Sequence, residues 1–170
     1  MPGPTIRAET PQDREAIAEV TTAAFRKRRE AEMIDAIRAS DGFVPELSLV
    51  AEVDGEVAGH VMLSHVGLEP SSRRVLELGP MSVAPDRQRG GIGSALVREA
   101  LRRADARAEP LVLVVGHPSY YPRFGFVPAA ELEIVPPDPR IPPDAFMAKP
   151  LTAYDRTLRG RIVFPEAFSA

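Results

Sequence analysis

The chain contains no cysteine. This absence excludes disulfide bonds, thiolate metal sites and any reaction through a cysteine-bound acyl intermediate. The sequence also has no run of about eighteen apolar residues, the length that crosses a bilayer, so we expect no membrane partner. It shows no internal repeat, and its 170 residues suit one domain with a substantial core. We therefore expect a single domain over residues 1–170.

A large excess of either charge is missing too. The net charge of -3 gives no broad attraction for phosphate backbones, so we expect no nucleic-acid partner. The cluster Arg26-Lys27-Arg28-Arg29 is local, and we interpret it as a solvated helix end. The first residues, Met1-Pro2-Gly3-Pro4, lack the charged-then-apolar pattern of a signal peptide. The absence of that pattern favours a cytoplasmic location.

An apolar strand, a glycine-rich turn and an amphipathic helix follow one another in the middle of the chain. The run 75–83 predicts a mostly buried strand, with a bulge where Gly79-Pro80 interrupts its hydrogen bonds. The helix after the turn has an apolar face formed by Leu96, Val97, Ala100, Leu101 and Ala104. Small residues at the helix start leave backbone N–H groups uncovered, and the helix dipole adds positive charge. We therefore expect this turn to bind an anion.

The turn contains the pattern Q-x-x-G-x-G at Gln88, Gly91 and Gly93. No lysine follows the glycines, which excludes the phosphate loop of nucleotide hydrolases, and the dinucleotide fingerprint fails because Leu96 takes its third glycine position. The pattern that remains resembles the acyl-coenzyme A loop of the GNAT superfamily of N-acetyltransferases.

A second motif follows the next apolar strand, 111–115. Tyr120, Tyr121, Gly125 and Phe126 match the aromatic-Tyr-x-x-x-Gly-Phe pattern of the same superfamily. The form P-S-Y-Y-P-R-F-G-F further resembles a bacterial subgroup of predicted acetyltransferases. The order and separation of the two motifs make a chance match improbable, and the resemblance spans most of residues 5–151.

The resemblance implies an α+β fold, in which a mixed, mostly antiparallel sheet splays at the cofactor strand and carries helices on both faces. Local patterns agree with this layout. Thr5–Arg7 predicts a strand, and Thr10–Asp13 predicts the start of a helix whose apolar face holds Ile17, Val20, Ala24 and Phe25. A second helix carries Met33, Ile34 and Ile37 and ends before Asp41-Gly42. In the superfamily these two helices border the acceptor site.

Further strands are expected on either side of this central region. Asp54-Gly55 predicts a two-residue hairpin between strands 47–53 and 56–66. Final strands are expected at 130–135 and 145–151. Between them lies the proline-rich stretch 136–143, which we interpret as a stiff loop. The alternative interpretation of this stretch is a rim of the acceptor site or a dimer contact. Residues 152–170 are too apolar for a free tail, so they should pack back on the domain.

The resemblance also implies a binding site for acetyl-coenzyme A on the splayed strand and the glycine turn. The residues concerned are Met81, Ser82, Val83, Gln88, Arg89, Gly90, Gly91, Ile92, Gly93 and Ser94. The superfamily's frequent asparagine before the tyrosine is absent, and Val114 stands at its place. No metal is expected, because His60 and His65, five residues apart on one strand, should point to opposite faces.

Tyr121 matches the residue that protonates the departing thiolate in the superfamily, and Tyr120 matches its aromatic neighbour. The alternative for Tyr121 is a packed ring whose hydroxyl bonds a backbone carbonyl. Glu77, on the cofactor strand, is the candidate base that would deprotonate the amine through water, or else a solvated strand glutamate. His117 is a further candidate, with a structural hydrogen-bonding role as its alternative.

These observations together predict an acyl-coenzyme A-dependent N-acyltransferase. It would move acetyl from acetyl-coenzyme A to a primary amine by direct attack in a ternary complex. The alternative is a catalytically silent acyl-coenzyme A-binding sensor with the same fold. The sequence does not select the acceptor, which could be a small molecule, a peptide or a protein lysine, and both a monomer and a homodimer stay open.

Overall fold

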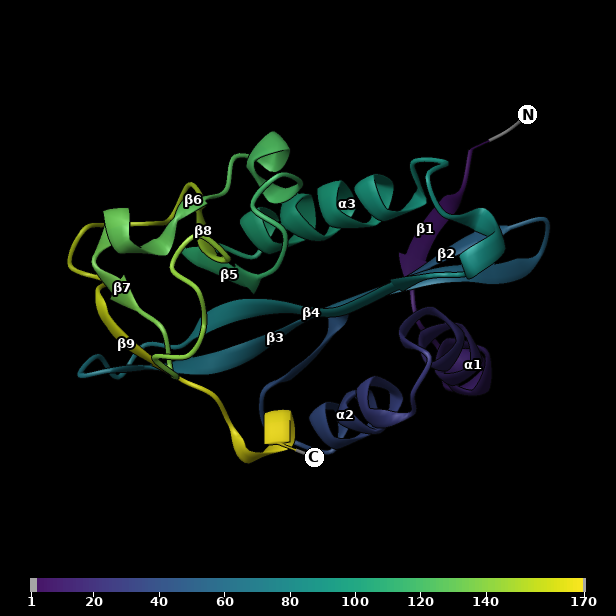
Figure 1. The fold of residues 1–170 in the computed structure, drawn as a ribbon, viewed down its shortest axis with the longest axis horizontal. Helices are drawn as coiled ribbons and strands as arrows, with labels where there is room; N and C mark the ends of the chain where they lie inside the picture. Colours follow the sequence, from purple (N-terminus) through teal and green to yellow (C-terminus); the bar gives the residue numbers. More distant parts are fainter. Residues whose placement is uncertain (1–2, 170) are drawn as a thin grey trace.

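The computed structural model describes residues 3–169, so Met1, Pro2 and Ala170, and with them part of the segment used to judge a signal peptide, lie outside it. Nine strands form a mostly antiparallel sheet, with the main order β1-β2-β3-β4-β5-β8-β6. Helix α3 covers one face, and α1 and α2 cover the other (Figure 1). This is the mixed sheet with helices on both faces that the sequence predicts.

The N-terminal elements are β1 (Thr5–Ala8), a 3₁₀ turn η1 (Pro11–Asp13), α1 (Arg14–Phe25) and α2 (Arg29–Arg38). The predicted helix start is confirmed, because the Asp13 carboxylate accepts the Thr10 backbone N–H at 2.7 Å. The same carboxylate accepts a hydrogen bond from Arg7 at 2.7 Å. The capping acid therefore also ties β1 to the beginning of α1.

The predicted hairpin joins β2 (Phe43–Val53) to β3 (Glu56–Glu69). Asp54 and Gly55 both have positive φ, 52° and 79°, as the favoured two-residue hairpin turn requires. Short polar side chains and glycine tolerate this conformation best, which explains why these two residues form the turn. The expected register around the turn, with Val53 opposite Glu56, is present.

Strand β4 (Val75–Val83) pairs with β3 along its length but with β5 (Leu111–Val115) only from Leu76 to Leu78. Opposite β3, Leu78 pairs with Leu63 and Met81 with Val61, so β4 has one extra residue in the intervening segment. This is the bulge expected at Gly79-Pro80. Beyond Leu78, β4 and β5 separate, and the sheet is open between them.

A 3₁₀ turn η2 (Pro85–Arg87) leads from β4 to α3 (Ile92–Ala106), whose predicted apolar face is buried. After β5, the 3₁₀ turn η3 (Tyr121–Phe124) precedes β6 (Val127–Pro128). The remaining elements are η4 (Ala129–Leu132), β7 (Ile134–Val135), β8 (Phe146–Pro150), β9 (Gly160–Val163) and η5 (Glu166–Ser169).

The strand expected at 130–135 is wrong for most of its length. Residues 129–132 form a 3₁₀ turn, Glu133 adopts a left-handed conformation with φ of 58°, and only Ile134 and Val135 are extended. Alternating apolar residues can pack from a short turn as well as from a strand, when the backbone forms its hydrogen bonds outside a sheet.

The strand expected at 145–151 is confirmed as β8. In the C-terminal segment, β9 pairs with both β3 and β7. None of the helices within residues 3–169 is long and apolar enough to cross a membrane.

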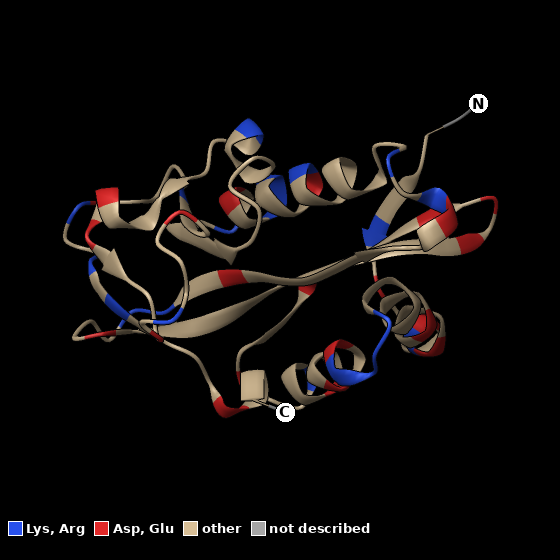
Figure 2. Ribbon diagram, in the orientation of Figure 1, with Lys and Arg blue, Asp and Glu red and all other residues tan. Residues whose placement is uncertain are grey.

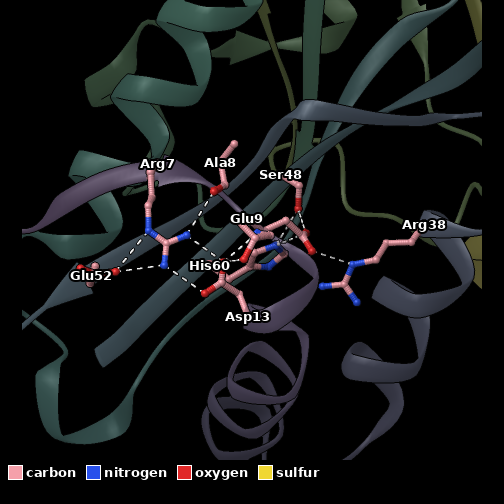
Figure 3. Close-up of polar contacts among 9 residues, drawn as sticks. Arg7, Ala8, Glu9, Asp13, Arg38, Ser48, Glu52 and His60 are labelled. Carbon is pink, nitrogen blue, oxygen red and sulfur yellow. Dashed lines mark hydrogen bonds and ion pairs between the residues drawn. The ribbon is translucent and has the colours of Figure 1, made fainter. Parts of the chain in front are cut away.

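A buried group of polar side chains anchors α2 to the sheet (Figure 3). Arg38 donates to Glu9 at 2.9 Å, and both side chains are nearly inaccessible, at 7% and 5% exposure. Glu9 also contacts Ser48 and His60, which themselves lie 2.9 Å apart. Burial alone would raise the pKa of Glu9, but hydrogen bonds from His60 and Ser48 and the charge of Arg38 lower it to about 2.

Replacing Arg38 with glutamine should reduce the free energy of unfolding by about 3 kcal/mol, because it leaves the buried Glu9 carboxylate without its cation. Arg159→Gln is the matched control: Arg159 forms an exposed pair with Glu133, worth less than about 1 kcal/mol. Urea unfolding at neutral pH measures both. The cost of Arg38→Gln should shrink as the pH falls, because Glu9 without its cation takes up a proton in the folded variant at a higher pH than in the folded wild type. Equal losses in the two variants would contradict this account.

Candidate active site

The opening between β4 and β5 forms a cavity of about 840 Å³. Its walls come from the separated parts of these two strands, the turn before α3, the first residues of α3, and η3. The C-terminal end of α1 closes it from the other face of the sheet. The cavity therefore passes through the sheet from the side of α3 to the side of α1.

The cofactor-binding residues predicted from the sequence gather at this cavity. Nine of the ten line its wall: Met81, Ser82, Val83, Gln88, Arg89, Gly91, Ile92, Gly93 and Ser94. Gly90 lies in the same turn but does not contribute to the wall. Residues separated in the sequence by the turn η2 are thus brought onto one surface.

The start of α3 presents free backbone donors to the cavity. Gly91 caps the helix with φ of 87°, a left-handed conformation that favours glycine, and no side chain in the described part of the chain caps this end. The first N–H to bond back into the helix is that of Ala95, at 3.0 Å from the Gly91 carbonyl oxygen. The Gln88 side chain donates to the Val83 carbonyl at 3.0 Å and so braces the turn. The residues present fit an anionic group at this helix start.

The two tyrosines have different surroundings. The Tyr120 hydroxyl lies 3.1 Å from the Ser94 hydroxyl, which links η3 to the start of α3. The Tyr121 ring packs against Gly116, where a Cβ atom would collide with it, and is 8% exposed. Between residues 3 and 169 no hydrogen bond joins the Tyr121 hydroxyl to a backbone carbonyl, so the expected structural alternative is not observed.

Burial, reinforced by the neighbouring Tyr120 and Glu77, raises the pKa of Tyr121 to about 12. The phenol therefore stays protonated across the neutral range. Tyr121 lines the cavity, and a protonated hydroxyl with no hydrogen bond to any of residues 3–169 is suited to donate a proton there.

Glu77 is buried rather than solvated, at 4% exposure, which overturns the solvated alternative. Glu77 is not part of the cavity wall, and its Oε1 has no hydrogen-bond partner among the described residues. Burial raises the pKa of Glu77 to about 8, although a hydrogen bond with the Val115 backbone opposes the shift. Ser64 lies opposite Glu77 on β3, and its hydroxyl is likewise buried with no hydrogen-bond partner in the part of the chain that the structure describes.

The histidines divide into one at the cavity and two elsewhere. His117 is exposed and lines the cavity, while its carbonyl accepts the Tyr120 N–H at 3.0 Å. His60 belongs to the buried group on the α2 side, and His65 bonds Glu109 at 3.0 Å after the end of α3. Among residues 3–169, no three histidine, cysteine, aspartate or glutamate side chains are grouped to hold a metal.

The sequence pattern misses part of the cavity wall. Ala24 and Phe25, which periodicity assigns to the packing face of α1, line the cavity, and Phe25 is 38% exposed. Thr21, one turn earlier, lies 3.1 Å from Ser82 on β4, and this buried contact fixes α1 against the cofactor strand. The spacing of Thr21, Ala24 and Phe25 along one helix face is the signal that points to this wall.

Comparison with known proteins agrees with the two motifs. The model of the acetyltransferase (GNAT) family matches residues 14–126. The chain belongs to this family, and it is an acetyltransferase. It is 32% identical over 163 residues to the "Uncharacterized N-acetyltransferase YjhQ" of Escherichia coli K12, covering 93% of this chain and 90% of that protein.

Two solved structures are similar over nearly the whole chain. The GNAT family N-acetyltransferase YhbS from Escherichia coli, in complex with coenzyme A, has a TM-score of 0.90 and 26% identity, covering 99% of this chain and 93% of that one. A GNAT family acetyltransferase from Brucella melitensis, in complex with acetyl-coenzyme A, has a TM-score of 0.80 and 34% identity, covering 97% of each chain.

Proposed function

We propose that the protein transfers acetyl from acetyl-coenzyme A directly to the primary amine of an acceptor, with both substrates bound in the cavity. One observation supports this most strongly. The start of α3 at Gly91, which has no side-chain cap among the described residues, and the ring of Tyr121 lie on the wall of the same cavity. The similar structures that contain coenzyme A and acetyl-coenzyme A support the choice of cosubstrate.

The cosubstrate would place its pyrophosphate on the N–H groups at the start of α3, where the helix dipole favours negative charge. Arg89, which lines the cavity beside this turn, can add a charge-assisted contact. The backbone of Met81, Ser82 and Val83 lacks a β5 partner and so can bind the pantetheine amides and polarise the thioester carbonyl.

In the reaction the amine nitrogen attacks the thioester carbonyl, a C–N bond forms, and the C–S bond breaks. The sulfur leaves as a thiolate, and Tyr121 gives it a proton. The ordinary pKa of a thiol is about 8.5, so the protonated phenol stabilises the charge as it builds on sulfur. The proton lost by the amine then balances the one given by Tyr121.

Glu77 is our candidate for accepting the amine proton. Since it is not part of the cavity wall, it would act through an intervening water molecule and only in its ionised form. His117, which does line the cavity, is the second candidate and could act directly.

Gly91→Val should weaken coenzyme A binding by about tenfold or more, because valine is strained at a φ of 87° and the turn must change shape. Calorimetric titration with coenzyme A measures the affinity. Gly55→Val is the control, since Gly55 has similar φ, 79°, but lies in the distant hairpin. Unchanged affinity in a folded Gly91→Val protein would remove the pyrophosphate from this turn.

Tyr121→Phe should lower turnover by about 10²- to 10⁴-fold while coenzyme A affinity changes little, because the ring is kept and only the proton donor is lost. Tyr120→Phe is the matched control: it removes a hydroxyl bonded to Ser94, and its effect should be much milder. Steady-state rates with an identified amine, measured together with thermal unfolding, separate chemistry from stability. Wild-type turnover in Tyr121→Phe across the pH range would make Tyr121 structural.

Glu77→Gln distinguishes the two candidate bases. If Glu77 accepts the proton, the rate of the wild type rises with pH through about 8, and the variant loses this rise together with about 10²-fold or more of its turnover. The raised pKa of Glu77 also costs folding free energy as the pH rises from about 4 to 8, since only the unfolded chain ionises there. The variant should therefore gain relative stability over that interval. A retained pH rise would assign the proton to His117 or to water.

A further inference from the structure

The charges around the cavity limit the kind of acceptor it can receive. No aspartate or glutamate in the described part of the chain lines its wall, and the charged residues that do are Arg89 and Arg123. An acceptor with several positive charges would therefore find no carboxylate to pair with. Such acceptors depend on acidic walls, because a desolvated cation without a partner is unfavourable.

The end of the cavity opposite the α3 start is formed by α1. Thr21 holds this helix to Ser82, and the next turn contributes Ala24 and Phe25 to the wall. Since the cosubstrate phosphates belong at the α3 start, this opposite end is the one left for the acceptor. The chain then continues directly into the cluster Arg26-Lys27-Arg28-Arg29, all four residues of which are exposed.

This basic cluster forms the connection between α1 and α2, visible as a blue segment in Figure 2. Lys27 has an acidic partner, Glu30, at 3.6 Å. Arg26, Arg28 and Arg29 form no ion pair with any of residues 3–169. The expected solvated helix end is thus confirmed, but its charge is largely uncompensated.

Helix stability does not account for these cations. Arg26 follows the C-terminus of α1, where positive charge is favourable, but Arg28 is the N-cap of α2 and Arg29 its first residue. Cations at the positive end of a helix dipole destabilise it. A local arrangement that opposes the stability of its own helix is typical of a functional region.

The acidic groups near this end do not cancel the positive charge. Glu30 is already paired with Lys27, and Glu32 lies within the first turn of α2, where it offsets part of the cluster. Glu77 is buried beside Tyr121, and burial keeps it largely uncharged at neutral pH. The connection that follows Phe25, which lines this end of the cavity, therefore carries a net positive charge.

We propose that the acceptor is an amine that also carries an anionic group, a carboxylate or a phosphate, and that Arg28 and Arg29 attract this group at the acceptor end of the cavity. The proposal rests on the acetyl transfer proposed above. The same positive charge favours the neutral form of the amine, which is the form that attacks the thioester. The positive charge of the protein thus acts on both the anionic group and the amine of the acceptor.

Acetylation of matched amines that differ only in charge tests this selectivity. The pairs are amino acids and dipeptides against their amides, and phosphoethanolamine against ethanolamine, with spermidine as a polycation; coenzyme A release and product mass give the rates. The anionic members should have kcat/KM at least about tenfold higher, and the advantage should fall as salt is added. A preference for amino acids selects carboxylate, and a preference for phosphoethanolamine selects phosphate.

The double variant Arg28→Gln/Arg29→Gln should raise KM several-fold for anionic members, with kcat, neutral members and coenzyme A affinity unchanged. Arg73→Gln/Arg159→Gln is the control, because it removes the same charge from exposed ion pairs outside the connection between α1 and α2. Equal or faster acetylation of neutral or cationic members, or an unchanged KM in the first variant, would overturn the proposal. Coenzyme A binding without acetylation of any amine would instead contradict the transfer reaction on which it rests.

Discussion

The separation of β4 from β5 after Leu78 is the constraint on which the rest of this structure depends. Paired strands have no free backbone groups and leave no room between them. Here the extra residue at Gly79-Pro80 directs β4 toward β3 alone, while β5 continues to pair with β8. The backbone groups of 81–83 are released, and a cavity opens through the sheet between its two helical layers.

The elements around this opening are held by contacts that do not themselves react. The Tyr120 hydroxyl joins η3 to α3 through Ser94, and Gln88 braces the turn between β4 and α3. On the other face, Thr21 fixes α1 to β4, and Arg38 fixes α2 through the buried Glu9. Three of these contacts hold elements that line the cavity, where Tyr121 lies with no hydrogen bond from its hydroxyl to any of residues 3–169.

Charged groups serve two separate purposes in this protein. Around Glu9 they are buried and paired, so that their electrostatic energy stabilises the position of α2 against the sheet. At the connection of α1 and α2 they are exposed, and only Lys27 forms an ion pair with another of residues 3–169. The first group therefore fixes the helix whose N-cap, Arg28, and first residue, Arg29, belong to the second.

Patterns that span only a few residues of the sequence determined most of the fold and the part of the site at the start of α3. A capping acid three residues after Thr10, a hairpin turn of two residues with positive φ, and glycines before an amphipathic helix each specify their structure within a few residues. The strand expected at 130–135 failed because its apolar residues suited a short turn equally well. Only the tertiary structure decided the burial of Glu77, the partner of Thr21, and the place of Ala24 and Phe25 in the cavity wall. These depend on contacts between segments as many as 61 residues apart, which neither periodicity nor spacing records.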